Sequence, residues 1–493
     1  MIIFVSDLHL TDGTFDYDGM VHDTSAGAYE MFWNDILSIV DANKDEGANV
    51  QKIKVVLLGD ILELRTTTRW MKAKTRPWLE NPNELSREAL DVLSQIIKNI
   101  IFEDPAIGQL RQRSYYLSNR YPDRIDAQNG LRRLLERNVE VSFVYVPGNH
   151  DRMILVGNDK QLRDIITDNL GWEIVGPDTL PGFPNEPRFR YPGLGIVANH
   201  GHGVDTIDFF NDYLQPTIGD LLPDIVGRMM NHAKNLEHIN PVEKKEIVRV
   251  ILNLDLVRPS RSQFAWLMQK IKSLESGSAD PGISAINKGL QEILVNTLKE
   301  LLDSSDAILE FLYPRIEDKA KKFGAVAISA FLLKDPAVLL CLFRKKKDAL
   351  KSLLKKIVGN VVERLEKDPK KLLESFERMA TNINGILPEK KKKGSKEEDY
   401  ALELLKEKDC SFVLFGHTHD YEICPMGTGK DGFYFNTGTW KKTVVKNYPA
   451  SDESGFQRWA RMTYVIFFDK GENKDHAFDL WHGNLQFEED KFI

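Results

Sequence analysis

The end of one predicted strand, at residues 143–151 (FVYVPGNHD), constrains this chain more than any other feature. Residues 143–146 are β-branched and aromatic, which is typical of a buried strand, and the Pro-Gly pair that follows stops the strand at once. Asn149, His150 and Asp151 come next, and each can bind a metal ion or exchange a proton. A buried strand that delivers three such side chains into one turn favours a binding site there.

Four other predicted strands end in the same way, with ligand-type side chains directly after an apolar run. These residues are Asp7 and His9 after 2–5, Asp60 after 53–58, His200 and His202 after 195–198, and His417 and His419 after 412–415. In α/β folds ligand sites lie at the carboxyl ends of strands, where neighbouring loops converge. Imidazole and carboxylate groups suit zinc, iron and manganese, and one carboxylate can bridge two ions.

Taken one at a time, these motifs have ordinary explanations. An isolated Asp-x-His or Gly-Asp is also typical of a surface loop or a turn, and a pair of histidines after a strand also occurs as a structural pair. The ordered set of five carries more weight, because six of the eleven histidines of the chain fall within it. The set therefore predicts one site built from five strand ends.

In chain order the motifs read D-x-H, G-D, G-N-H-D, H and G-H-x-H, and they resemble the calcineurin-like metallophosphoesterase superfamily. The resemblance implies an α/β fold, with a metallophosphoesterase-type β-sandwich flanked by helices and a dinuclear metal centre at one edge. It implies that one ion is held by Asp7, His9 and His419, the other by Asn149, His200 and His417, with Asp60 between them. His150 would stabilise charge on the phosphoryl group or protonate the leaving oxygen, and Asp151 would orient it.

The function implied is that of a metal-dependent phosphoric ester hydrolase. Such an enzyme cleaves a phosphodiester or pyrophosphate bond of a phosphate-ester substrate with a metal-bridging hydroxide. The implied cofactors are two divalent metal ions, Mn, Fe or Zn, with Mn expected in vitro. Three alternatives stay open: a phosphomonoesterase, a nuclease of the same superfamily, and a non-catalytic scaffold that binds partners through a helical insertion.

Some motifs are similar to the UDP-2,3-diacylglucosamine hydrolase branch of the superfamily, namely residues 7–10 (DLHL), 59–63 (GDILE), 416–419 (GHTH) and 438–440 (GTW). That branch typically has Arg at the position of His150 and Asp at the position of His202, so the lipid-linked substrate does not follow. His202 can contact substrate or metal, or be a supporting or surface histidine. Glu63 can support the turn at Asp60 or be a surface acid.

The hydrophobic pattern changes along the chain and indicates the domain organisation. Helices are predicted near 28–43, 85–101 and 160–169, and late strands at 433–435, 464–468 and 478–481. From 206 to 408 the apolar residues fall at helical spacing, as at Ile286, Leu290, Ile293 and Leu294. We therefore expect a core made of residues 1–205 and 409–493, interrupted by a large all-helical insertion of residues 206–408, about one domain in size.

Charge is uneven within this insertion. The whole chain has a net charge of −7, but residues 344–396 hold 17 Lys and Arg against 7 Asp and Glu, a local +10. This basic stretch follows the apolar residues 323–343, and such a pair favours peripheral membrane or lipid contact through the insertion. A buried helix pair with a solvated charged face is the alternative, and nucleic acid is not excluded as a partner.

Location follows from cysteine usage and hydropathy. The three cysteines have no CxxC spacing, which favours a reducing compartment. No stretch has the pattern of a signal peptide or a clean transmembrane helix. The expected location is cytoplasmic, with a peripheral membrane position as a second hypothesis.

Overall fold

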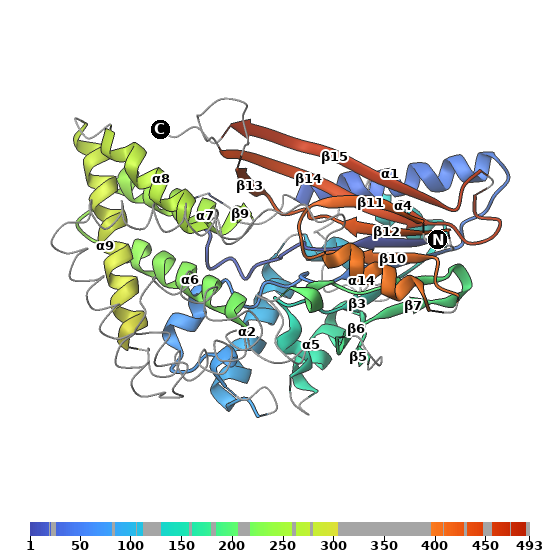
Figure 1. Ribbon diagram of the computed structural model, residues 1–493, viewed down its shortest axis with the longest axis horizontal. Helices are drawn as coiled ribbons and strands as arrows, with labels where there is room; N and C mark the ends of the chain where they lie inside the picture. The colour runs from blue at the N-terminus through green and yellow to red at the C-terminus, as the bar shows by residue number, and fades with distance from the viewer. Residues whose placement is uncertain are drawn as a thin grey trace. The chain divides into compact units, whose positions relative to one another are not determined.

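The computed structural model describes residues 1–18, 20, 26–80, 84–104, 106–111, 130–156, 160–178, 184–205, 217–258, 263–276, 280–303, 396–407, 409–427, 431–446, 456–473 and 475–489. The chain divides into two compact units (Figure 1). The first, the core unit, joins Met1–Asp220 with Lys393–Asp490, and the second, the helical unit, joins Leu221–Lys392 with Lys491–Ile493.

The first sheet of the core unit is mixed. Its strands run in the order β4-β3-β2-β1-β14-β13, and β15 pairs with β14. These strands are β1 (Ile2–Val5), β2 (Lys52–Leu58), β3 (Glu140–Val146), β4 (Glu173–Ile174), β13 (Thr443–Lys446), β14 (Phe456–Phe467) and β15 (Phe478–Glu489). β1 to β4 are parallel, whereas β14 lies antiparallel to β1. The first three strands therefore end at the same edge of the sheet.

The second sheet has the order β11-β12-β10-β8-β7. Its strands are β7 (Phe189–Tyr191), β8 (Ile196–Ala198), β10 (Phe412–Phe415), β11 (Tyr421–Gly427) and β12 (Asp431–Thr437), while β5 (Pro177–Asp178) and β6 (Glu186–Pro187) pair separately. β10 lies between β8 and β12 and is parallel to both, although more than 200 residues separate it from β8 in the chain. This parallel pair brings two further ligand-bearing strand ends together.

Alternate residues of the two sheets form one apolar core. The first sheet contributes Ile2, Phe4, Val56, Leu58, Val144 and Val146, and the second contributes Ile196, Ala198, Leu414 and Phe435. All of these side chains are buried, which is what the two-residue period of a strand predicts for faces that pack on each other. The fold is thus a mixed α/β structure whose sheets bury a common face.

Helices cover the sheets of the core unit. They are α1 (Ala26–Asp45), α2 (Arg87–Glu103), α4 (Gly130–Glu136), α5 (Gln161–Leu170) and α14 (Lys396–Leu405). α1 lies on the first sheet, where the Phe32 ring is 5.1 Å from the Tyr464 ring. α2 starts at Ser86, whose side chain accepts a hydrogen bond from the Ala89 N–H at 3.2 Å, a standard N-cap.

Helix α14 belongs to the core unit, although the sequence placed residues 396–408 in the insertion. Its Tyr400 and Leu404 are buried with Val413 and Tyr434 of the second sheet. These contacts explain why the core resumes at Lys393 and not at residue 409.

In the helical unit the described helices are α6 (Leu221–Lys234), α7 (Pro241–Leu256), α8 (Gln263–Ser276) and α9 (Pro281–Asp303). One short strand, β9 (Val257–Arg258), departs from the expected all-helical character. Pro259 follows it, and a residue before proline avoids the helical conformation. The apolar and basic residues 323–396, on which the membrane hypothesis depends, lie outside the described residues except for Lys396.

None of the described helices combines the length and the apolar character needed to cross a membrane. Most of the expected local elements are confirmed: residues 53–58, 143–146 and 412–415 lie in β2, β3 and β10, and residues 28–43 lie in α1.

Candidate metal centre

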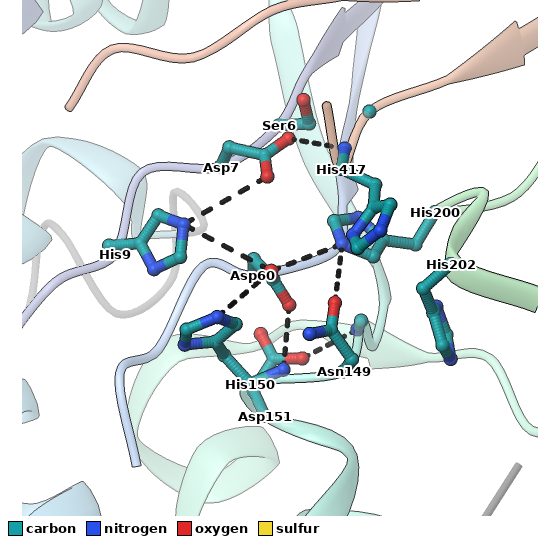
Figure 2. A network of polar contacts seen from close by, with 12 residues as sticks. Ser6, Asp7, His9, Asp60, Asn149, His150, Asp151, His200, His202 and His417 are labelled. Atoms are coloured by element: carbon teal, nitrogen blue, oxygen red, sulfur yellow. Dashed lines mark hydrogen bonds and ion pairs between the residues drawn. The ribbon is translucent and has the colours of Figure 1, made fainter. Parts of the chain in front are cut away.

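The five ligand-bearing strand ends converge at one edge of the core unit (Figure 2). In the first sheet Val5 is level with Leu57, and Leu58 is level with Val146, so β1, β2 and β3 end together. In the second sheet Ala198 is level with Leu414, so β8 and β10 also end together. The structure thus brings together Asp7, His9, Asp60, Asn149, His150, Asp151, His200, His202, His417 and His419, of which all but His150 and His417 are buried.

Backbone strain is concentrated at this edge. Among the described residues eight that are not glycine have a positive φ, and five of them are proposed ligands: Asp7 (52°), His9 (49°), Asp60 (53°), His417 (72°) and His419 (64°). Such a conformation is uncommon for residues with a Cβ and persists only where the surroundings impose it. The chain therefore departs from its preferred geometry at the positions where these side chains are directed inward.

Close approach at this edge also requires glycine. A Cβ at Gly148 would lie 2.3 Å from Asp60 Oδ1 and 2.8 Å from His200 Cδ2. A Cβ at Gly59, which has a φ of +83°, would lie 2.2 Å from His200 Nδ1. Both glycines allow the loops after β2 and β3 to pack directly against the His200 ring.

The first ligand group consists of Asp7, His9 and His419. His419 Nε2 lies 3.3 Å from Asp7 Oδ1 and 3.2 Å from His9 Nε2. The other ring nitrogen of His9 lies 2.9 Å from Glu63 Oε2 and must donate to this carboxylate, so its Nε2 carries a lone pair. Asp7 Oδ1 is buried and accepts no hydrogen bond. The three side chains thus have the spacing of a group that could hold a metal ion.

The second ligand group consists of Asp60, Asn149, His200 and His417. His200 Nδ1 lies 3.0 Å from the carbonyl oxygen of Leu58, which can only accept, so the ring donates there. His200 Nε2 faces Asp60 Oδ2 and Asn149 Oδ1, each 3.1 Å away, so the imidazolium form of the ring donates to these oxygens and the neutral form presents a lone pair beside them. A metal ion at this position would replace the proton on Nε2, and the three atoms would then face the ion together.

Asp60 lies between the two groups. Its Oδ2 is 3.1 Å from His200 Nε2 and 4.0 Å from His9 Nε2, and Figure 2 shows His9, His150 and His200 around it. Its Oδ1 accepts a hydrogen bond from the backbone N–H of His150 at 2.8 Å. This carboxylate is therefore the one placed to bridge two ions.

Buried charges set the pKa values of the centre. Burial raises the pKa of Asp60, but His200 and His150 outweigh it and hold that pKa well below its ordinary value. Burial lowers the pKa of His200, but Asp60 and Asp7 outweigh it and raise that pKa to about 10. Burial and the neighbouring His150 lower the pKa of His9 to about 3, so its ring is neutral at pH 7, as a metal ligand must be.

Glu63 is the residue that orients the histidines. It is fully buried, and its Oε2 accepts hydrogen bonds from Nδ1 of His9 and from Nδ1 of His150, at 2.9 and 2.6 Å. Burial raises its pKa, but His150 and His9 outweigh burial and hold the pKa well below its ordinary value. The sequence had left open whether Glu63 is a support or a surface acid, and the structure makes it a support.

The expected orientation of His150 by Asp151 is wrong. Asp151 Oδ2 accepts hydrogen bonds from the backbone N–H groups of Ile61 and Leu62 at 2.8 and 3.2 Å, and from the Tyr145 hydroxyl. Asp151 therefore ties the loop after β2 to the end of β3 and does not contact the His150 ring nitrogen that Glu63 holds. Burial and the nearby Asp60 raise its pKa to about 6.

His202 is not a surface residue, since only 1% of it is exposed. Its ring centroid lies 5.4 Å from that of His200 and 6.2 Å from that of His417. Its Nδ1 is 3.8 Å from Oε2 of the buried Glu186. It therefore packs behind the second ligand group, and its contribution to chemistry stays a prediction.

Three groups of described side chains at this edge have the composition and spacing of metal sites: Asp7, His9 and His419; His9, Glu63 and His150; and Asp60, His200 and His417. Imidazole, carboxylate and amide oxygen together suit zinc, iron or manganese. Comparison of the chain with protein-family models, with curated proteins and with solved structures gives no match.

Proposed function

We propose that this chain is a dinuclear metal-dependent phosphoesterase of the calcineurin-like metallophosphoesterase type, which hydrolyses a phosphodiester or pyrophosphate bond. The observation that supports it most is the arrangement around Asp60, with two groups of ligand atoms on either side of one buried carboxylate. On each side of it a histidine Nε2 lies 3.1–3.3 Å from a carboxylate or amide oxygen, an arrangement of ligand atoms that suits a divalent ion.

The donor set fits two divalent ions. Asp7, His9 and His419 would hold one, Asn149, His200 and His417 the other, and Asp60 would bridge them. When bound, such a pair lowers the pKa of a water molecule and neutralises charge on the phosphate oxygens. Manganese, iron and zinc all suit these ligands, and manganese is the ion we would supply in vitro.

His150 is the residue best placed to move a proton. It is 15% exposed at its side chain, in contrast to the buried ligands, and its Nε2 lies 3.8 Å from Asp60 Oδ2. The Glu63 carboxylate accepts a hydrogen bond from Nδ1 of His150, which leaves Nε2 as the atom that would protonate a departing alkoxide.

The same centre would serve a phosphomonoesterase or a nuclease, and these remain the alternatives within enzymes. A non-catalytic scaffold is a weaker candidate, because such a protein has no need for His150 and Glu63 beside the ligands. We place the enzyme in the cytoplasm. Membrane, lipid or nucleic-acid contact through the helical unit remains a prediction that concerns residues outside those described.

Hydrolysis of matched artificial substrates tests the proposal. Protein loaded with Mn²⁺ is given bis-p-nitrophenyl phosphate and p-nitrophenyl phosphate, alongside Asp60→Ala and the control Asp479→Ala, a half-exposed residue paired with His476. We expect diester hydrolysis that Asp60→Ala abolishes together with metal binding and that the control retains. Hydrolysis of the monoester alone would make the protein a phosphatase, and an active Asp60→Ala protein would refute the centre.

His150→Ala separates metal binding from chemistry. This variant should bind Mn²⁺ as the wild type does and lose most turnover, because only the proton donor is missing. If it loses the metal instead, His150 is a ligand and the proposed mechanism is incorrect.

A further inference from the structure

Three fully or almost fully buried charged residues form an ion cluster in the core unit. Arg65, Arg152 and Asp220 are 2%, 0% and 0% exposed. Asp220 Oδ1 lies 2.9 Å from Arg65 Nη1, and its Oδ2 lies 2.6 Å from Arg152 Nη2. One carboxylate thus neutralises two guanidinium groups only in part, and the cluster keeps a net charge of +1.

Both arginines belong to loops that carry residues of the proposed metal centre. Arg152 Nη1 donates a hydrogen bond to the backbone oxygen of Asn149 at 2.6 Å. The backbone N–H of Arg65 donates to Glu63 Oε1 at 3.1 Å. Asp220 therefore connects the loop after β3, which holds Asn149 and His150, with the loop after β2, which holds Asp60 and Glu63.

Asp220 is itself held firmly. Its Oδ2 accepts hydrogen bonds from the backbone N–H of Thr217 at 2.6 Å and from the Thr217 hydroxyl at 3.2 Å. Burial raises its pKa, but Arg152 and Arg65 outweigh burial and lower that pKa to about 2, so the carboxylate is charged under ordinary conditions. It is also the last residue of its segment of the core unit, directly before the helical unit begins at Leu221.

We infer that Asp220 is a positioning residue of the proposed metal centre, and that it acts through Arg152 on Asn149. The inference rests on the proposed function, since Asn149 is one of the expected ligands. Buried ion pairs are poor sources of net stability, but each fixes the direction of its partners. Without the Asp220 carboxylate, Arg152 loses the partner that holds its guanidinium against the Asn149 backbone. The side-chain oxygen of Asn149, 3.1 Å from His200 Nε2, then loses its defined place.

The test is the affinity of the full-length protein for Mn²⁺, measured by calorimetric titration after chelation. Asp220→Asn should bind Mn²⁺ roughly 10- to 100-fold more weakly, which is the usual effect of losing support behind a ligand. The matched control is Asp224→Asn in the helical unit. Asp224 is 4% exposed and forms a comparable pair with Arg228, at 2.9 Å. Both residues of this pair lie in α6, so this variant should keep wild-type affinity even though it loses stability.

A second variant covers the case in which Asp220→Asn does not fold. The double substitution Arg65→Gln with Asp220→Asn removes one positive and one negative charge, so the buried net charge stays at +1 while Arg152 loses its ionic partner. We expect it to fold, as judged by circular dichroism, and to show the same loss of Mn²⁺ affinity.

Two results would overturn the positioning role: a folded Asp220 variant with wild-type Mn²⁺ affinity, or an equal loss of affinity in Asp224→Asn. Failure of the wild type to bind Mn²⁺ would instead reject the metal centre itself, so the two failures are distinguishable.

Discussion

Replacement of Glu63 by glutamine tests the reasoning about the centre most directly, because it changes one oxygen to an NH₂ group without changing size. Glu63 Oε1 accepts hydrogen bonds from the backbone N–H groups of Arg65 and Thr66 at 3.1 and 3.0 Å, so the glutamine oxygen must stay on that side. The NH₂ group then faces Nδ1 of His9 and of His150. Both rings must become acceptors at Nδ1, and their protons move to Nε2.

The consequence for His9 is a proton on the nitrogen that faces His419 Nε2 at 3.2 Å. The proton occupies the lone pair of His9 Nε2, which a metal ion would need. The Glu63 carboxylate, which held the His9 ring through Nδ1, is also lost. A hydrogen bond to a charged group contributes about 1.5–3 kcal/mol. At about 1.4 kcal/mol per factor of ten, Mn²⁺ affinity should fall roughly 10- to 100-fold. A comparable further loss of turnover at saturating Mn²⁺ follows because His150 loses the carboxylate that accepts its Nδ1 hydrogen bond and orients its ring.

Calorimetric titration with Mn²⁺ and diester hydrolysis at saturating Mn²⁺ measure the two effects separately. Glu186→Gln is the matched control, since Glu186 is equally buried but bonds to Tyr400 and Asn199. Because Glu186 accepts its hydrogen bonds from Tyr400 and Asn199 and not from a histidine of the first ligand group, Glu186→Gln should change Mn²⁺ affinity little. A Glu63→Gln protein with wild-type affinity and turnover would show that the tautomer argument is wrong.

Three further outcomes are expected. Gly148→Ala should abolish Mn²⁺ binding because its Cβ would lie 2.3 Å from Asp60 Oδ1, whereas Gly427→Ala, with no atom within 4 Å of its Cβ, should bind normally. Asp220 has its pKa lowered from 3.8 to about 2, so it stabilises the folded state above pH 3.8 and this contribution is lost as the pH falls toward 2. The stability difference between wild type and Asp220→Asn in urea unfolding should therefore shrink by about 2 kcal/mol over that interval. Removal of metal by a chelator should lower the melting temperature, and Mn²⁺ at a hundred times its dissociation constant should restore about 2.7 kcal/mol; no shift would argue against a specific site.

Local features of the fold could be predicted because short runs of residues determine them. The strand predicted at 412–415 is β10 as observed, since an apolar run bounded by polar residues and glycine specifies its own limits. The sequence does not predict β11, because this segment contains Pro425 and has no apolar run. It is a strand because it pairs with β12 at the edge of the second sheet.

For the candidate site, too, the sequence predicts the local features and not the long-range ones. The residue types after each strand indicate metal ligands, because the chemistry of imidazole and carboxylate is a property of the side chain alone. The partners of those side chains depend on what other loops present. Asp151 is next to His150 in the chain, yet its carboxylate accepts hydrogen bonds from the backbone of Ile61 and Leu62. The ring of His150 is hydrogen-bonded by Glu63 instead.

By itself, therefore, the sequence determined where strands end and which ligand-type groups follow them. Only the tertiary structure decided that β1, β2 and β3 lie side by side in one sheet, that β8 and β10 meet in another, and that Asp220 joins two of their loops. The physical reason is that a buried carboxylate is stable only where hydrogen-bond donors surround it. Those donors come from segments far away in the chain, which no local pattern encodes.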